Sequence, residues 1–212
     1  ALKLIWLEIP IEKARLIPIA TEMGFTFHHA NEDSLTVTYR VQTDAFIPTY
    51  ATHCIGAGGV VLNSRRQLLV VNERHRRDLS RPHWKLPGGA LLAGEHLAEA
   101  VVREVLEEGG VQVDHRELIK AAVILFHNEM YDCKVHVYLA PWHYPRLQET
   151  DERGAHVWYD RASPPLSNMM VADRDWLPLV LAGKYVKGEV WYGPNQESVQ
   201  KCELDCVEPD EL

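Results

Sequence analysis

The stretch from Gly89 to Val111 constrains this chain most, because it combines a helical pattern with a cluster of acidic side chains. Residues three and four apart share one face of an α-helix, so Glu104, Glu107 and Glu108 are predicted to project to one side. Three carboxylates this close repel one another unless a cation compensates their charge. Oxygen ligands of this kind suit a hard divalent cation such as Mg2+. The alternative is an acidic helix with a solvated face, which leaves the glycines and the arginine unexplained.

The spacing around these carboxylates is regular and reads G-x5-E-x7-R-E-aliphatic-x-E-E-x-G-aliphatic. This pattern is the Nudix box, and the chain therefore resembles a Nudix hydrolase with every defining position filled. The resemblance implies an α/β fold, the Nudix α/β/α sandwich with a mixed sheet. It also implies hydrolysis of the pyrophosphate bond in a nucleoside diphosphate that is linked to another moiety. The filled positions are Gly89, Glu95, Arg103, Glu104, Val105, Glu107, Glu108, Gly110 and Val111.

Position by position, the resemblance assigns the metal to oxygen atoms of the box. Glu104 and Glu108 are the leading ligands, and Glu107 comes next. The Gly89 carbonyl is a further ligand, because glycine permits the tight turn that aims a backbone oxygen inward. Glu95 is expected to act through water or a second ion. The implied cofactor is Mg2+, for which Mn2+ can substitute.

Two catalytic assignments reach beyond the metal ligands. Arg103 is expected to pair with a neighbouring carboxylate and fix its rotamer, although a solvated surface arginine is the alternative. The general base lies on the box helix in some relatives, where Glu107 fits, and on a later loop in others, where Glu152 fits. Glu149 and Asp151 compete with that loop residue, and all three could instead be solvent-facing charges.

Substrate contacts are expected from residues that flank the box. Arg74 and Lys85 are cationic and could contact the phosphates. A nucleobase could stack on Trp84, Phe126 or Tyr131, because aromatic faces suit such contacts. The alternative for each ring is ordinary packing, and Trp84 in particular could lie under the box loop.

The chain is expected to contain three parts. These are a small α/β unit over residues 1–48, a Nudix domain over 53–190 and an acidic tail over 191–212 that is either disordered or packed on the surface. The phrase from Gly24 to Ala30 and the approach from Trp84 to Pro87 are similar to Nudix proteins with a small pre-Nudix domain. That group includes plant ADP-ribose and NADH pyrophosphatases. In this resemblance the first unit mediates a homodimer.

ADP-ribose and NADH are therefore the favoured substrates, but the chain departs from those relatives. Residues 122–125 read Ala-Val-Ile-Leu where the relatives carry Arg-Gln-x-His on the strand after the box. The proline about fifteen residues past the box and the SQPWPFPxS array are also missing. Coenzyme A, dinucleoside polyphosphates and nucleoside triphosphates remain alternative substrates. A nucleotide sensor without turnover is a further alternative, which the complete carboxylate set disfavours.

The composition of the chain limits the kinds of partner that it is expected to bind. The formal net charge of -8 disfavours nucleic acid, which needs a cationic surface. No stretch approaches 18 apolar residues, so no membrane span is expected, and the N-terminus lacks the pattern of a signal peptide. The four cysteines form no C-x-x-C pair, which favours reduced thiols in a cytoplasmic protein over a zinc site. The expected partner is a small-molecule nucleotide.

Overall fold

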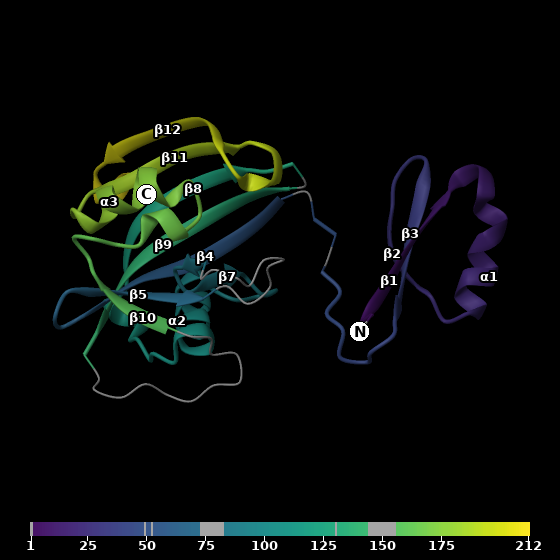
Figure 1. The fold of residues 1–212 in the computed structure, drawn as a ribbon, viewed down its shortest axis with the longest axis horizontal. Coiled ribbons are helices and arrows are strands. Elements are labelled where there is room, and N and C mark those ends of the chain that lie inside the picture. The colour runs from purple at the N-terminus through teal and green to yellow at the C-terminus, as the bar shows by residue number, and fades with distance from the viewer. Residues whose placement is uncertain (1, 49, 52, 73–82, 130, 144–155) are drawn as a thin grey trace. The chain divides into compact units, whose positions relative to one another are not determined.

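The computed structural model describes residues 2–48, 50–51, 53–72, 83–129, 131–143 and 156–212. The chain divides into two compact units, Ala1–Ala51 and Thr52–Leu212 (Figure 1). We expected the first unit to end at residue 48, the second to begin at 53, and a separate tail to begin at 191. The second unit instead runs to the last residue.

The first unit is a three-stranded antiparallel sheet with one helical segment. The strands β1 (Leu4–Pro10), β3 (Ser34–Arg40) and β2 (Thr26–Ala30) lie in that order. A 3-10 helix (Ile11–Leu16) leads into α1 (Ile17–Glu22). Pro18 lies in the first turn of α1, where its missing N–H leaves no helical hydrogen bond unmade. The small core consists of Ile9, Ala20 and Val37, with Ile17, Phe25 and Leu35 packed against it.

The second unit is built on one mixed sheet. Its path runs β10-β5-β4-β9-β8-β11-β12, with β6 paired to β5 and β7 paired to β4. The pairs β4–β9 and β8–β11 are parallel, and the others are antiparallel. The strands are β4 (His53–Asn63), β5 (Gln67–Asn72), β6 (Trp84–Lys85), β7 (Gly88–Ala90), β8 (Ile119–His127), β9 (Asp132–Trp142), β10 (His156–Asp160), β11 (Tyr185–Tyr192) and β12 (Val199–Val207).

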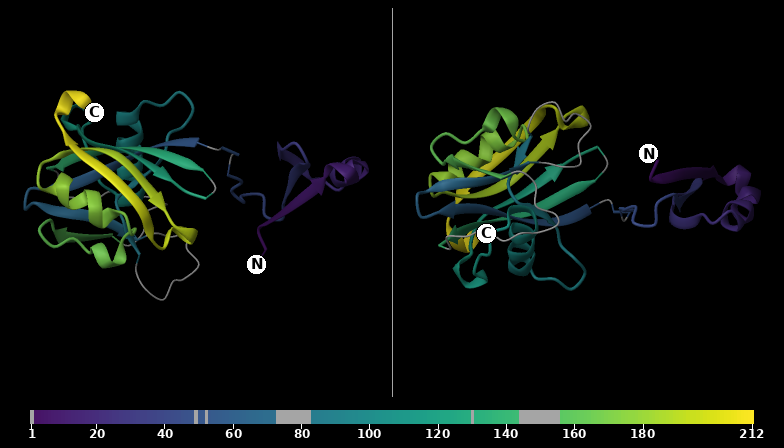
Figure 2. Two further views of the ribbon diagram at one scale, coloured as in Figure 1. Left: turned by 90° about the horizontal axis from the view of Figure 1, so that it is seen from above. Right: turned by 60° about the horizontal axis from the view of Figure 1, so that its bottom comes forward.

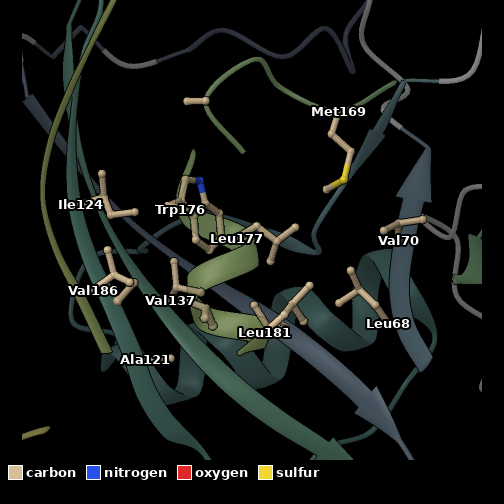
Figure 3. Close-up of a cluster of buried hydrophobic side chains, with 14 of the residues drawn as sticks. Leu68, Val70, Ala121, Ile124, Val137, Met169, Trp176, Leu177, Leu181 and Val186 are labelled. Carbon is tan, nitrogen blue, oxygen red and sulfur yellow. The ribbon is translucent and has the colours of Figure 1, made fainter. Parts of the chain in front are cut away.

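Helices cover both faces of this sheet and confirm the predicted α/β/α sandwich. On one face α2 (Leu97–Gly109) buries Val101 and Val105. On the other face α3 (Asp173–Leu181) buries Trp176 and Leu177 in the cluster of Figure 3. Short 3-10 helices occupy His115–Glu117, Leu166–Asn168, Pro194–Gln196 and Pro209–Glu211. No described helix is long and apolar enough to cross a membrane.

The segment expected to be an acidic tail contains an edge strand of the main sheet. β12 pairs with β11 from Tyr185 opposite Val207 to Tyr192 opposite Val199, and Figure 2 shows the two strands side by side. Leu204 is partly buried, whereas most of its neighbours on β12 are exposed. An edge strand is held by main-chain hydrogen bonds and needs few apolar side chains. The low apolar content of this segment therefore did not indicate a strand. The strand β11 was also not predicted from the sequence.

Candidate functional site

The box helix starts and ends at local signals. At its start His96 and Glu99 form a capping box, in which the His96 N–H donates to the Glu99 carboxylate at 3.0 Å. At its end Gly110 adopts a left-handed conformation with φ of 66° and its N–H donates to Leu106 and Val105 carbonyls. The helix is therefore fixed in length, and this fixes which face its acidic residues present.

The glycine-containing strand β7 packs directly against that acidic face. β7 pairs with β4, with Gly89 opposite Ala57. A Cβ added at Gly89 would stand 2.4 Å from Oε1 of Glu104 and 2.7 Å from its Cδ. These separations are far below van der Waals contact, so only glycine lets the β7 backbone approach the carboxylate this closely.

Arg103 connects the carboxylates of the box. Its Nε and Nη2 donate to the two oxygens of Glu95 at 2.7 and 2.9 Å, a bidentate ion pair. Its Nη1 donates to Glu104 at 2.7 Å and to Glu107 at 3.1 Å, and Nη2 also donates to the Ala90 carbonyl at 3.2 Å. The hydrogen bonds from Arg103 and from the Leu92 N–H lower the pKa of Glu95 to about 2. Glu95 is thus a fixed anion that anchors the arginine.

Glu104 is in the opposite electrostatic situation. Burial raises the pKa of its carboxyl group above the ordinary value, and Arg103 only partly opposes this effect. The neighbouring charges of Glu108 and Glu107 raise it further. An additional cation beside Glu104 would therefore be favourable.

Glu108 is held by the residues that precede the box. The Gly88 N–H donates to its Oε2 at 3.0 Å, and Lys85 Nζ lies 2.7 Å from its Oε1. The same Nζ donates to the Gly88 carbonyl at 3.2 Å. With Arg103 and Lys85 on the carboxylates, no three acidic, histidine or cysteine side chains in the described part of the chain converge on a metal position.

A cavity of about 370 Å³ opens beside β7. Its lining includes Lys85, Gly88 and Gly89, which touch Glu108 and Glu104 and which we call the box end. It also includes the aromatic side chains of Phe126, Tyr131, Trp176 and Tyr192, which we call the aromatic or α3 end. Its volume lies within the range of small-molecule sites.

A larger hollow of about 690 Å³ lies elsewhere, along the outer side of α2, with Val102, Leu106 and Arg116 in its lining. Glu95 and Arg103 of the box also line it, whereas Glu104 and Glu108 line neither cavity. The smaller cavity is distinguished by lining residues that touch both Glu104 and Glu108.

A buried carboxyl group also lines the smaller cavity. Asp173, the first residue of α3, is 9% exposed and its Oδ1 accepts a hydrogen bond from Trp176 Nε1 at 3.1 Å. Burial raises the pKa of Asp173 to about 7, although the bonds from Trp176 and Met170 oppose this. Sequence reasoning missed this residue. The available signal was an aspartate three positions before a tryptophan at the start of a helix.

The other residues predicted to contact the substrate lie in different surroundings. Trp84 is 8% exposed, lies in the core on the α3 side and meets Tyr159 edge to face, so core packing replaces its expected stacking role. Phe126 and Tyr131 both line the cavity. Arg74, Glu149, Asp151 and Glu152 lie outside the described residues.

Comparisons with known proteins agree with this geometry. Nudix hydrolase 8 of Arabidopsis thaliana is 38% identical over 117 residues, which are 54% of this chain and 32% of that protein. The mouse protein called nucleoside diphosphate-linked moiety X motif 6 is 41% identical over 116 residues, 54% of this chain and 36% of that protein. The chain thus spans about a third of the length of these curated relatives.

Solved structures share the fold. A MutT protein from Bacillus halodurans has a TM-score of 0.60 at 21% identity, over 72% of this chain and 97% of that one. A NUDIX hydrolase from Nitrosomonas europaea has a TM-score of 0.56 at 15% identity, over 79% and 94%. Residues 1–41 match a family model described as Nudix hydrolase domain, and residues 52–180 match the model described as NUDIX domain. The second match covers more than half of the chain, which therefore belongs to the Nudix family.

Proposed function

We propose that this chain is a Mg2+-dependent enzyme that hydrolyses the pyrophosphate bond of a nucleoside diphosphate derivative, with ADP-ribose and NADH as the first candidates. One observation carries the proposal. Glu104 and Glu108 of α2 lie against Gly89 and Gly88 of β7, and these glycines line a cavity that is also lined by aromatic side chains. A nucleotide has the matching parts, an anionic diphosphate and a flat base.

The residues present fit a divalent cation. Glu104 is partly buried beside two further carboxylates, so its charge is under-compensated, and all the available donors are oxygen atoms. Glu104 and Glu108 would hold the ion, with Glu107, the Gly89 carbonyl and Glu95 as further donors. When bound, the ion neutralises phosphate charge and lowers the pKa of a coordinated water.

The remaining charged residues have distinct roles in this proposal. Arg103 keeps the carboxylates of Glu95, Glu104 and Glu107 in place. Lys85 lies at the cavity end nearest Glu108 and supplies a cation for the phosphates. Glu107, whose side chain is 38% exposed, can reach an attacking water as the general base. Glu152 on the later loop stays the competing candidate.

The aromatic end of the cavity suits a nucleobase. Phe126 and Tyr131 offer ring faces for stacking. Asp173 offers a carboxyl group that can accept a hydrogen bond and, when protonated, donate one. These groups fit the base of ADP-ribose or NADH, and they fit other nucleotides as well.

We also propose that the first unit mediates a homodimer. This unit is the one that resembles a pre-Nudix domain. It exposes several large apolar side chains, among them Trp6 at 45%, Phe27 at 65% and Phe46 at 83%. Exposed apolar side chains of this size are candidates for a protein interface. Light scattering should give twice the mass of one chain, and replacing Phe27 by Glu should shift that mass toward the monomer. A monomeric mass for the unaltered chain would rule the homodimer out.

The free thiols fit our assignment to the cytoplasm.

The test is a nucleotide panel with the purified chain. ADP-ribose, NADH, NAD+, coenzyme A, dinucleoside polyphosphates and nucleoside triphosphates are incubated with Mg2+ or Mn2+, and products are separated by chromatography. Glu108→Gln should abolish most turnover because it removes a metal ligand. Glu99→Gln is the matched control, since it changes a glutamate on the same helix and a glutamine can keep the capping box.

Several outcomes are informative. Equal turnover by Glu108→Gln and the unaltered chain would refute the mechanism. ADP-ribose binding without any product would favour the nucleotide sensor. Circular dichroism and melting of both variants separate a lost ligand from a lost fold.

A further inference from the structure

Two cysteine side chains face each other in the wall of the cavity. Cys54 on β4 and Cys133 on β9 are direct partners in the register of that parallel pair. Both are free thiols, and both line the cavity. Neighbouring strands lie about 4.8 Å apart, and disulfides join Cα atoms about 4.4–6.8 Å apart. The backbone therefore already holds this pair at a separation that a disulfide requires.

The two thiols also interact with each other. Burial, followed by a hydrogen bond with Cys54, raises the pKa of Cys133 to about 12. Cys133 consequently keeps its proton at neutral pH. Because the two side chains are within hydrogen-bonding reach, a sulfenic acid formed on one sulfur would lie beside the other thiol.

We propose that Cys54 and Cys133 form a dithiol site that a hydroperoxide closes to a disulfide. One sulfur of the pair attacks the terminal peroxide oxygen and breaks the O–O bond, giving a sulfenic acid and releasing an alcohol, or water from hydrogen peroxide. The other sulfur then attacks the oxidised sulfur, the S–S bond forms and water leaves. Two thiols are oxidised by two electrons in total, and one hydroperoxide is reduced.

The two cysteines line the same cavity as Gly56 and Gly89. The position that a Cβ would take at Gly56 is 3.7 Å from Cys133 Sγ and 3.4 Å from the Gly89 carbonyl oxygen, and Gly89 lies beside the Glu104 carboxylate. A disulfide would therefore change the cavity wall beside the box. This consequence rests on the proposed function, and it predicts slower hydrolysis in the oxidised form.

The first test is chemical and needs no substrate. The full chain is reduced, freed of reductant, treated with hydrogen peroxide and then alkylated. Intact mass should show the loss of two hydrogen atoms and two fewer alkylated thiols per chain. Peptide mapping should find Cys54 and Cys133 in one cross-linked product. Oxygen addition at Cys54 without that cross-link would overturn the proposal.

The chain supplies its own matched control. Cys202 and Cys206 lie four residues apart on β12 and are exposed. At about 3.3 Å per residue they are roughly 13 Å apart, too far for a disulfide within one strand. The double variant Cys202→Ser/Cys206→Ser should keep the cross-link, whereas Cys54→Ser or Cys133→Ser should lose it. A cross-link that depends on Cys202 or Cys206 would refute the assignment.

The second test measures the ratio of hydrolysis rates before and after peroxide. We expect at least a fivefold decrease that a thiol reductant reverses, and no such decrease in Cys133→Ser. A cross-linked chain with an unchanged rate would overturn the link to the box. Failure of the reduced chain to hydrolyse any nucleotide would count against the proposed function alone, because the mass measurement decides the dithiol site separately.

Discussion

The two ends of the cavity are built in different ways. The box end is charged and comes from one helix and the loop before it, with Arg103, Lys85 and the Gly88 N–H holding the carboxylates. The α3 end is aromatic, and its residues come from β8, β11, α3 and the loop before β9. One end therefore rests on local ion pairs, and the other on the convergence of distant strands. We infer that the first end governs the reaction rate and the second governs which nucleoside binds.

We expect the largest loss of activity from a substitution at the box end, Gly89→Ala. Gly89→Ala forces a methyl group into the space of the Glu104 carboxylate. We expect kcat to fall by at least about 100-fold, roughly 3 kcal/mol in the barrier. Gly94→Ala is the control, because no atom lies within 4 Å of its Cβ, although its φ of +83° makes it cost some stability. The measurement is steady-state kinetics of both variants and the unaltered chain with the best substrate. Equal kcat values for Gly89→Ala and the unaltered chain would refute the close approach of Gly89 to Glu104.

Arg103→Lys tests the positioning role of the guanidinium. A lysine cannot make the bidentate pair with Glu95 while also reaching Glu104. We expect kcat to fall by about 10–100-fold, with a smaller change in KM. The pKa of Glu95 should rise from about 2 toward its ordinary value, which carboxyl NMR can follow. A purely structural role would lower the melting temperature and leave the activity per folded molecule unchanged.

Phe126→Leu tests the aromatic end. The substitution keeps an apolar side chain on β8 but removes the ring that lines the cavity. Base stacking on an aromatic ring contributes about 1–3 kcal/mol, so we expect KM to rise by about tenfold while kcat changes little. A decrease in kcat without a change in KM would contradict the separation of the two ends.

Asp173→Asn has the smallest expected effect on activity, about fivefold in KM, as for one hydrogen bond of about 1 kcal/mol. Its pH dependence is more informative. The folded pKa of about 7 lies above that of an exposed aspartate, so the stability from the protonated carboxyl is full below about pH 4. That stability is lost as the pH rises through 7. The stability of the variant relative to the unaltered chain should therefore increase between pH 4 and 7. Urea unfolding across this range measures it, and a constant difference would exclude a buried ionisable carboxyl.

The same contrast explains what could be predicted from sequence. The acidic residues of the box follow one helical repeat, so the shared face of Glu104, Glu107 and Glu108 could be predicted from sequence. The close approach of Gly89 to Glu104 could not, because sequence reasoning assigned Gly89 only as a carbonyl ligand. Asp173 joins the cavity only because α3 packs across the sheet, and no local pattern connects it with Phe126. For Trp84 the structure matches the packing alternative, because its side chain lies in the core and meets Tyr159.

The guanidinium of Arg103 has one more consequence, which concerns assembly of the site before any ion arrives. Many metal sites are disordered without their ion because the ligands repel one another, so that binding and folding are one event. Here a permanent internal cation already touches three of the carboxylates. Under the proposed function, a chelator should therefore abolish hydrolysis while leaving the melting temperature almost unchanged. A site that is folded before its ion binds would let the concentration of free divalent cations set the activity.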